Sequence, residues 1–501
     1  MREFEHPIRN LRVGLRPEGR SRNTDFLSES ACARPGQYRL QGYSPEISNF
    51  PPVTVSGVAL NLVQPWPFPQ VFQTDSGIYL GTTSGVYQIL TMGTATWTAA
   101  KLGTWSGTVS WPWTIANCPM FPVFCSGDLM VYYDYDSRAW ISWDLAVGSG
   151  QGTKWNVAWP QPVTCCYNNG QFMMGGAKAA TTAPSQTRII RWSQINSFDF
   201  AGNTAEDRYN AAGFMYLPTD DDDIVLRILP LGKNFVAYSN FGVFILYPVN
   251  ERFLPPTFGW KMIHNVGIPS VGAAAWNGVD GAGAENVFVD RLGQLHHISS
   301  TFVVTNKGYD EFLLPMLADP LLYISYNLAE SEYYLGDGQT GYLSNKYGFG
   351  TTNKCITSMI DYRNVNSTHG TDISEVENIP IGLFYETGGS QFLAVTDTLD
   401  FGIRGIKTIQ TVEVGYDAYS SNICEVAIDY RYDKSSPFRR SPWKRVNKEG
   451  VVVPMVAGVD LRVAVRATPY DVDVDYINVR WKLSDRRHIR GVYSNVGSTN
   501  S

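Results

Sequence analysis

The chain has 501 residues, of which 44% are apolar, 13% aromatic and 17% charged, and its formal net charge is −6 at pH 7. A chain of this length can bury a large core in more than one domain, and its 46 glycines and 28 prolines leave little room for long helices. We therefore expect an all-β protein with wide covered surfaces. The negative balance excludes a protein that grips nucleic acid over its whole surface.

The cysteines indicate a reducing compartment rather than a disulfide framework. Their number is odd, their spacing is irregular, and the sequence contains no Cys-x-x-Cys pair. They are Cys32, Cys118, Cys125, Cys165, Cys166, Cys355 and Cys424. The first residues lack the apolar core of a secretory signal, and no apolar run approaches the roughly 18 residues of a membrane span. We expect a protein that is made and folded in cytoplasm.

Residues 1–54 are rich in arginine and poor in apolar periodicity, which favours an extended N-terminal arm. Such an arm either lies on a neighbouring subunit or is a partly disordered leader, and the sequence leaves both open. Arginine suits a subunit contact because its fork-shaped head group pairs well with carboxylates. The arginines are Arg2, Arg9, Arg12, Arg16, Arg20, Arg22, Arg34 and Arg39.

Residues 55–350 carry a repeated pair of apolar segments, which is clearest in Asn234–Ser239 and Val243–Val249. The turn Asn240-Phe241-Gly242 joins these two segments, so they predict a β-hairpin. Apolar residues on both faces indicate strands covered on both sides. Fainter copies recur roughly every 40 to 60 residues, a spacing typical of propeller blades. We predict a β-propeller of about six blades in this region.

Residues 351–491 change to alternating apolar and polar positions, as in Ile406–Val414, Glu425–Tyr432 and Asp473–Trp481. Alternation is typical of antiparallel sheets with one buried face, so we predict a C-terminal β-sandwich. Residues 492–501 are expected to form a disordered tail.

Common catalytic and cofactor motifs are not present in the sequence. Gly336–Gly341 fits G-x-G-x-x-G by letter, but it lies between two predicted strands and is expected to be a hairpin turn. His296 and His297 should point to opposite faces of a strand, with no third ligand nearby. We therefore predict no catalytic residue, no cofactor and no metal site. Glycosidases of the propeller class use scattered carboxylates without a motif, so an enzyme remains an alternative.

Two charged segments are candidate interaction sites. Asp220, Asp221, Asp222 and Asp223 lack the glycine and terminal glutamate of a calcium loop, and they predict a solvated or subunit-facing acidic turn. A basic cluster near the C-terminus includes Phe438 and Trp443, which is typical either of a phosphate-binding strip or of a rim that docks onto an acidic partner. We favour docking because the chain is acidic overall. The cluster consists of Arg439, Arg440, Trp443, Lys444 and Arg445, followed by Arg486, Arg487 and Arg490.

The order of several short segments resembles the tail nozzle proteins of short-tailed bacteriophages, also called tail accessory factors or tail hubs. Arg191–Phe200 with Glu206–Tyr209 resembles a W-S plus D-R-Y segment of that family's propeller. His264–Pro269 is similar to the turn that follows the family's central hairpin, and Ser441–Val446 with Asp460–Arg466 is similar to its C-terminal strands. The resemblance covers roughly residues 70 to 490, and its order is more specific than any single motif.

The resemblance implies a structural protein of the virion tail, assembled in the host cytoplasm and without catalysis. Members form a hexameric ring below the portal and its adaptor, extend the DNA channel, help to retain the genome, and carry tail fibres, a needle or a plug. Contact with phage DNA would be transient and non-specific. On this interpretation Asp220–Asp223 face the channel lumen, and the basic cluster docks onto the adaptor or a neighbouring subunit.

Two other classes of protein fit the predicted fold. A carbohydrate-active propeller enzyme or lectin would have two or three convergent carboxylates and exposed aromatic residues in a pocket on the propeller axis. A fibre or adhesin component of the tail would bind a host receptor instead. The assembly state discriminates them, because a nozzle subunit forms rings whereas an enzyme can remain monomeric.

Overall fold

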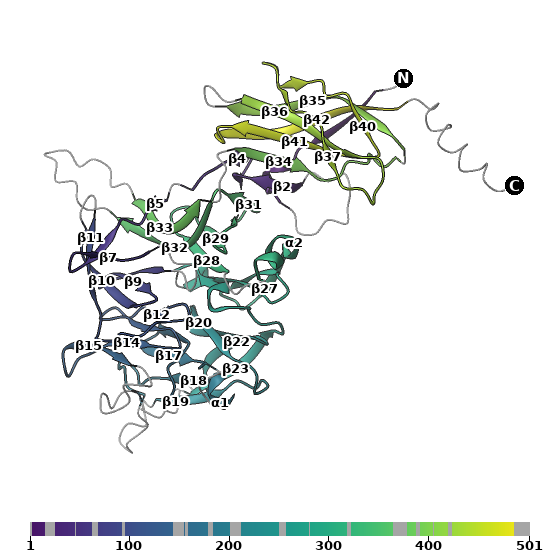
Figure 1. Cartoon of the computed structure of the whole chain (residues 1–501). Helices are drawn as coiled ribbons and strands as arrows, with labels where there is room; N and C mark the ends of the chain where they lie inside the picture. The colour runs from purple at the N-terminus through teal and green to yellow at the C-terminus, as the bar shows by residue number, and fades with distance from the viewer. Residues whose placement is uncertain are drawn as a thin grey trace. The chain divides into compact units, whose positions relative to one another are not determined.

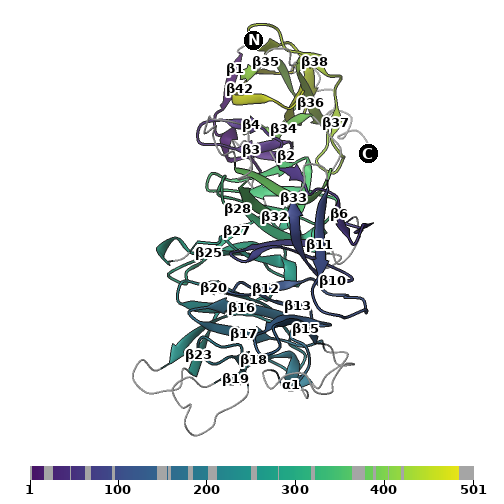
Figure 2. The same cartoon turned by 90° about the vertical axis from the view of Figure 1, so that its left-hand side faces the viewer.

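The computed structural model describes most of the chain, and it is mostly β (Figures 1 and 2). Within the described residues the helices are single turns: α1 (Pro184–Thr187), α2 (Asp310–Leu313), η1 (Leu11–Val13), η2 (Val271–Ala273), η3 (Gly281–Gly283) and η4 (Leu314–Leu317). The described residues are 3–15, 26–45, 47–62, 69–92, 96–143, 155, 159–178, 184–200, 212–249, 257–279, 281–317, 322–363, 378–386, 391–403, 405–418 and 423–484.

The chain divides into two compact units, each made of separate stretches of sequence. Unit 1 comprises Met1–Pro45, Thr340–Cys355 and Glu386–Ser501, and unit 2 comprises Glu46–Gln339 and Ile356–Tyr385. The predicted layout of arm, propeller and sandwich is not confirmed, because the strands of residues 4–42 belong to unit 1 together with C-terminal strands. Long-range strand pairing, which composition does not reveal, determines this division.

Unit 2 contains a series of sheets that follow one another along the chain. The first sheet has the order β7 (Val58–Ala59), β6 (Val53–Val55), β11 (Trp97–Lys101), β10 (Gly85–Met92), β9 (Gly77–Thr82) and β8 (Gln70–Thr74). Next come β12 (Thr114–Ala116), β13 (Val123–Cys125), β14 (Met130–Asp134) and β15 (Ala139–Trp143), and then β16 (Thr164–Asn168), β17 (Gln171–Gly175), β18 (Ile189–Trp192) and β19 (Gly213–Tyr216).

The remaining strands of unit 2 continue this arrangement. They are β20 (Val225–Leu231), β21 (Asn234–Ser239), β22 (Val243–Val249) and β23 (Thr257–His264); β24 (Ala274–Trp276), β25 (Glu285–Val289), β26 (Leu295–Ser299) and β27 (Val304–Gly308); the pair β28 (Tyr323–Asn327) and β29 (Glu332–Gly336); and β32 (Lys354–Arg363), β33 (Asn378–Glu386) and β5 (Ser48–Asn49). The hairpin predicted from Asn234–Ser239 and Val243–Val249 is confirmed as β21 and β22, with the predicted bounds.

Neighbouring sheets of unit 2 pack face to face through large side chains. Trp113 fits against Gly81 of the preceding sheet, where a Cβ atom would lie 2.6 Å from the indole ring. The sheets that begin with β12 and β16 share a core that includes Met130 and Phe172. The core of the first sheet also contains Ile360 of β32, so the last sheet of the unit packs against the first. Side chains buried on both strand faces explain the apolar runs in the sequence.

Unit 1 contains two groups of paired strands. One has the order β30 (Gly341–Ser344), β31 (Phe349–Thr352), β3 (Ala33–Pro35), β4 (Leu40–Gly42), β42 (Val472–Leu483), β35 (Lys407–Ala418) and β39 (Val451–Val452), with β1 (Phe4–Ile8) on β42 and β40 (Val456–Gly458) on β35. The other has the order β2 (Leu27–Ala31), β34 (Phe392–Thr396), β41 (Asp460–Thr468), β36 (Ile423–Arg431) and β37 (Arg439–Arg440), with β38 (Lys444–Arg445) on β36.

The alternation predicted for Asp473–Trp481 is present in β42. Val472, Val474, Ile477 and Val479 are buried, whereas the residues between them face outward. A bulge between Val474 and Tyr476 shifts the register opposite β35, and it keeps the apolar face inward after two successive outward positions. The predicted alternation is therefore observed, with one local interruption.

Four sequence predictions fall wholly or partly on residues outside the described part of the chain. These are the arm arginines Arg2, Arg16, Arg20 and Arg22, the segment Glu206–Tyr209, the basic residues Arg486, Arg487 and Arg490, and the expected tail 492–501. Within the described residues, no helix has the length and apolar character needed to cross a membrane.

Candidate functional site

An edge of unit 1 carries four residues of the basic cluster predicted from the sequence. Strand β37 pairs Arg440 with Asp429 of β36, and β38 pairs Arg445 with Glu425 further along the same strand. Both two-residue strands are exposed and lie at the outer edge of their sheet. The chain thus places Arg439, Arg440, Lys444 and Arg445 on one sheet edge, which we call the basic edge.

The two aromatic residues of the basic edge are covered by arginines of the same unit. The guanidinium carbons of Arg462 and Arg431 lie 4.1 and 4.5 Å from the centre of the Phe438 ring. Those of Arg466 and Arg440 lie 4.3 and 5.4 Å from the centre of a Trp443 ring. The Trp443 side chain also packs against a cluster of small buried residues. Because the rings are engaged within the unit, they are poorly placed to stack on nucleic-acid bases.

Most of these arginines are also neutralised by carboxylates. Arg440 donates two hydrogen bonds to Asp429, at 2.7 and 2.9 Å, and these bonds raise the pKa of its guanidinium. Arg466 and Arg431 pair with Glu425 and Asp460 at 2.7 and 2.8 Å. Paired guanidinium groups of this kind fix the edge rather than attract a phosphate backbone.

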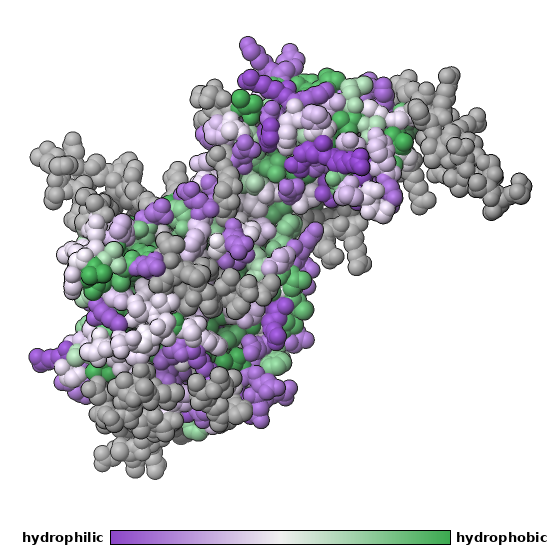
Figure 3. All heavy atoms as spheres, viewed as in Figure 1, coloured by the Kyte–Doolittle hydropathy of each residue, from purple (hydrophilic) through white to green (hydrophobic). Residues whose placement is uncertain are grey.

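Other cations of the basic edge have no carboxylate partner. Within the described part of the chain, Arg439 and Arg445 form no ion pair, and both side chains are exposed. Lys444 donates instead to the carbonyl oxygen of Val453, at 2.9 Å. Val453 and Met455 are themselves more than half exposed, and hydrophilic and hydrophobic residues are interspersed over this unit in Figure 3. The basic edge therefore combines unpaired positive charge with exposed apolar surface, as protein interfaces do.

The other group of strands in unit 1 carries an acidic patch, formed by Asp417, Asp471, Asp473 and Asp475. Arg39 bridges two of these carboxylates, with its Nε 2.7 Å from Asp475 and its Nη1 on Asp417. Burial raises the pKa of Asp473, the neighbouring aspartates raise it further, and Arg39 lowers it in part. A single described arginine thus offsets four close carboxylates, so the patch keeps a negative charge.

The four consecutive aspartates 220–223 form a turn before β20. Asp220, Asp221 and Asp222 are exposed, and Asp221 pairs with Arg188 at 2.7 Å. Asp223 is buried instead, and its Oδ1 accepts the backbone N–H of Ile224 at 2.8 Å. Three of the four side chains are thus available to solvent in the isolated chain, and Asp223 is not.

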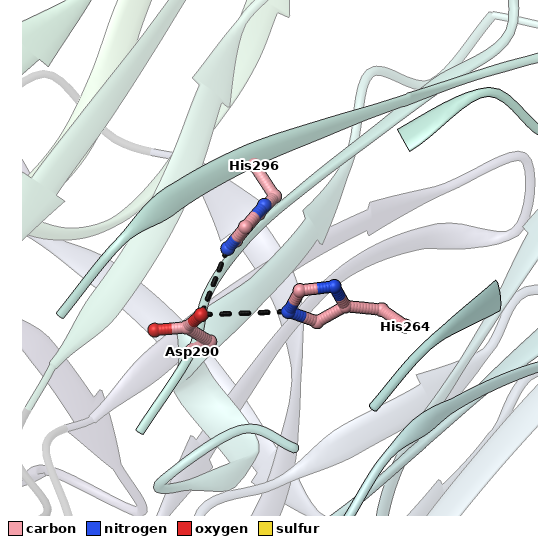
Figure 4. A group of neighbouring side chains, drawn as sticks. All are labelled: His264, Asp290 and His296. Carbon is pink, nitrogen blue, oxygen red and sulfur yellow. Dashed lines mark hydrogen bonds and ion pairs between the residues drawn. The ribbon is translucent and has the colours of Figure 1, made fainter. Parts of the chain in front are cut away.

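A cluster that the sequence analysis missed lies between β23 and β26 (Figure 4). The Asp290 Oδ2 atom lies 2.8 Å from Nε2 of His296 and 3.4 Å from Nε2 of His264, and both imidazoles point toward it. The Asp290 Oδ1 atom accepts the backbone N–H groups of Leu292 and Gln294, each at 2.9 Å. Burial raises the pKa of this carboxyl, but these hydrogen bonds outweigh burial and hold the pKa well below its ordinary range.

The expectation that His296 has no third ligand nearby is wrong, since the three side chains offer ligand atoms within 4.8 Å of one another. The opposite orientation of His297 is confirmed, because this residue bonds Glu285 instead, at 2.7 Å. Two imidazoles and one carboxylate could hold a divalent cation. However, a histidine that binds metal normally donates its second ring nitrogen, and Nδ1 of His296 is buried without a partner in the described residues. The geometry fits a structural hydrogen-bonded cluster better.

Unit 2 also contains an open cavity of about 800 Å³. It is lined by an edge strand of each successive group in the unit, namely β8, β12, β16, β20, β24, β28 and β32. Ser358 of β32 joins the two ends of this series, because its hydroxyl accepts the N–H of Val71 at 2.9 Å and donates to the carbonyl of Val71 at 3.1 Å. Among the described lining residues Asp75 is the one carboxylate and Arg227 the one cation.

Comparisons with known proteins give little information about this chain. No protein-family model matches the sequence, and no curated protein matches it either. Among solved structures, an exo-β-1,3-galactanase from Phanerochaete chrysosporium bound to galactose is similar over 63% of this chain and 95% of its own chain, with 7% sequence identity and a TM-score of 0.24. Values this low do not support an inference about activity.

Proposed function

We propose that the chain is a structural subunit of a virion tail, one of six copies in a nozzle below the portal and adaptor of a short-tailed bacteriophage. In this role it extends the DNA channel, helps to retain the genome and carries the fibres, needle or plug. The order of the sequence segments described above supports this assignment. The observation that carries it is the basic edge, where Arg439 and Arg445 are exposed, form no ion pair with a described residue, and lie beside exposed apolar residues.

The arrangement of strands supports a role as a rigid wall. We assign unit 2 as a β-propeller of seven blades, one for each strand group that lines its cavity, and unit 1 as a β-sandwich. This is one blade more than the sequence spacing predicts. The additional blade comes from β32, β33 and β5, and β5 is distant in sequence from the other two strands. Circular closure leaves few open sheet edges, which suits a load-bearing part of an assembly.

The charges of unit 1 support contact between copies of the chain. The basic edge lies on one strand group and the acidic patch on the other, so each copy offers both members of a complementary pair. Contacts between two different surfaces of identical chains generate a ring when the rotation closes. Complementary charge also guides the encounter and fixes the register of such a contact. The adaptor and the distal tail proteins would bind at the ends of this ring.

The presence of free thiols is consistent with assembly in the host cytoplasm before the particle is released. All seven cysteines are free, including Cys125 and Cys165, which are buried in one core cluster. Burial and the neighbouring thiol hold the pKa of Cys125 well above its usual range, which keeps it protonated and unreactive.

The alternative of a carbohydrate-active propeller receives less support from the cavity. Glycoside hydrolysis ordinarily uses two carboxyl groups about 5 to 10 Å apart. The described lining supplies Asp75, which lies at the turn after β8, and no second carboxylate.

The experiment that tests the proposal uses light scattering to measure assembly of the full chain with the portal–adaptor complex. Arg439→Glu combined with Arg445→Glu reverses the unpaired charges of the basic edge, and we expect this pair to abolish ring formation on the portal–adaptor complex. Lys233→Glu, a charge reversal of the same sign at an exposed position in unit 2, is the matched control and should leave assembly intact. Assembly by the double variant as well as by the wild type would contradict the proposal.

A further inference from the structure

The strand β20 contains a charged residue in an otherwise apolar sequence, Val-Leu-Arg-Ile-Leu-Pro-Leu. This residue, Arg227, lines the cavity of unit 2. Its Nε atom is buried and has no hydrogen-bond partner in the described part of the chain. The side chain as a whole is half-buried. Partial removal of a guanidinium from water without a counter-charge is costly, and proteins retain such a group mainly where a ligand or a carboxylate compensates it.

The groups that surround Arg227 do not supply this compensation. Its electrostatic neighbours are the thiols of Cys165 and Cys166 and the phenols of Tyr238 and Tyr323. Burial raises the pKa of Cys166 and of Tyr238 far above neutrality, so these two groups carry no charge at pH 7. Burial also lowers the pKa of Arg227 itself, which reflects the desolvation of its cation. The guanidinium therefore remains positive without an anionic partner among the described side chains.

The rest of the lining fits a small molecule. A volume of about 800 Å³ falls in the range of ligand pockets, roughly 300 to 1,000 Å³, and far exceeds the space of a few waters. The exposed residues Asp75, Gly278 and Leu328 also line the cavity, so it opens to solvent near the ends of β8, β24 and β28. Aromatic rings offer apolar surface to the body of a ligand, and they belong to Phe72, Tyr167, Trp276, Tyr323 and Tyr326.

We propose that this cavity binds a small organic molecule carrying an oxyanion, either a carboxylate or a phosphate group, with Arg227 as its counter-charge. The planar fork of a guanidinium matches both kinds of oxyanion through two parallel hydrogen bonds. The aromatic lining holds the remainder of the molecule. This site belongs to unit 2 of a single chain and does not depend on the assembly proposed above.

Calorimetric titration of the purified full chain tests the proposal, with citrate and inorganic phosphate as probes and sodium chloride of equal ionic strength as the reference. We expect saturable binding of at least one probe, and the probe that binds better identifies the head group. Arg227→Gln should weaken this binding by about tenfold or more, because it removes a charge-assisted pair. Asp75→Asn is the matched control from the same lining, and it should leave the affinity unchanged or increase it because it removes a negative charge.

Failure of both probes to bind beyond the chloride reference would overturn the proposal, because Arg227 would then need no anionic ligand. Binding by Arg227→Gln with wild-type affinity would overturn it as well. If Arg227→Gln does not fold, Arg227→Lys serves in its place, because it keeps the charge but loses the two-pronged donor. We expect this variant to bind several-fold more weakly, and an unchanged affinity would count against the site.

Discussion

The two units of the molecule treat charged residues in different ways. Unit 2 encloses them, as with Asp290 among two histidines and Arg227 beside the cavity. Unit 1 places them on its surface, where arginines pair with carboxylates and cover aromatic rings. At the basic edge a few cations have no ion-pair partner among the described residues. Enclosed charges respond to substitution through the free energy of folding, whereas surface charges respond mainly through association. We therefore expect substitutions in unit 1 to act mainly on association, and those in unit 2 to act mainly on stability.

The largest effect should come from the enclosed carboxylate of unit 2. Asp290→Asn removes the acceptor shared by His264 and His296, and we expect it to lower the free energy of unfolding by about 3 kcal/mol because it breaks a buried network. Urea unfolding at pH 7 measures the change. Asp222→Asn, at an exposed position, is the control and should change stability by less than about 0.5 kcal/mol. Equal losses of stability in Asp290→Asn and Asp222→Asn would contradict the role of the buried network.

The same residue gives a prediction for pH. The folded-state pKa of Asp290 lies below the unfolded value, so its stabilising contribution is fully present above the ordinary carboxyl pKa of about 4. The contribution is lost as the pH falls from there through the lower folded-state value. The difference in unfolding free energy between wild type and Asp290→Asn should therefore shrink on acidification. A difference that stays constant from pH 7 down to pH 2 would contradict the assigned hydrogen bonds.

A smaller loss of stability is expected when Trp443, the aromatic residue beside the basic edge of unit 1, is replaced. Trp443→Ala removes an indole that packs against Val395, Ala427 and Ala464 and that lies against two guanidinium groups. Because the side chain is only half-buried, we expect a loss of about 1 to 2 kcal/mol in the free energy of unfolding. Tyr432→Ala, an exposed aromatic near the same edge, should stay within about 0.5 kcal/mol. A loss above that for Asp290→Asn would reverse the contrast between the units.

Removal of a negative charge from the acidic patch should raise the stability of the chain slightly but weaken its self-association. The raised pKa of Asp473 means that its ionised form is disfavoured in the folded state, so stability falls as the pH rises from about 4 through the raised value. Asp473→Asn should therefore raise the free energy of unfolding slightly, by at most about 0.5 kcal/mol at this partly exposed site. The same variant should weaken self-association. An unchanged association constant in sedimentation would separate the patch from the subunit contact.

We expect neither a chelator nor added Zn²⁺ to change the stability of the chain. We expect the melting temperature of the chain to be the same with a chelator, without one and with added Zn²⁺, because His264, Asp290 and His296 already satisfy one another by hydrogen bonds. Stabilisation by Zn²⁺ that disappears in a His296→Gln variant would show instead that the cluster is a metal site.

The local sequence pattern predicted individual strands and hairpins, but it could not predict which distant strands pair with each other. The two apolar runs around Asn240–Gly242 lie close in sequence and form the predicted hairpin β21–β22. Strand β2, with the sequence Leu-Ser-Glu-Ser-Ala, is short and polar, and it becomes a strand because β34 lies beside it, more than 350 residues later in the sequence. Propensity alone does not identify such a partner. This is why residues 1–54 were expected to form an arm.

In the candidate sites too, residues close in sequence were predictable, whereas partners from distant strands were not. The basic edge was predictable because Arg439–Arg445 is a local cluster, but the neutralising carboxylates and the stacked guanidinium groups come from β36 and β41. His264 and Asp290 lie 26 positions apart and meet through the packing of successive sheets. Two local signals were available: an aspartate four residues before Gln294 in an Asx-type turn, and an arginine within the apolar strand β20.

The measurement that tests the central claim most directly is electron microscopy of the purified chain mixed with the portal–adaptor complex encoded in the same genome. If the chain is a nozzle subunit, rings of six copies should be added to the end of that complex. The Arg439→Glu, Arg445→Glu double variant should not form these rings. A wild-type chain that stays monomeric beside the complex and cleaves glycosidic bonds would contradict this assignment.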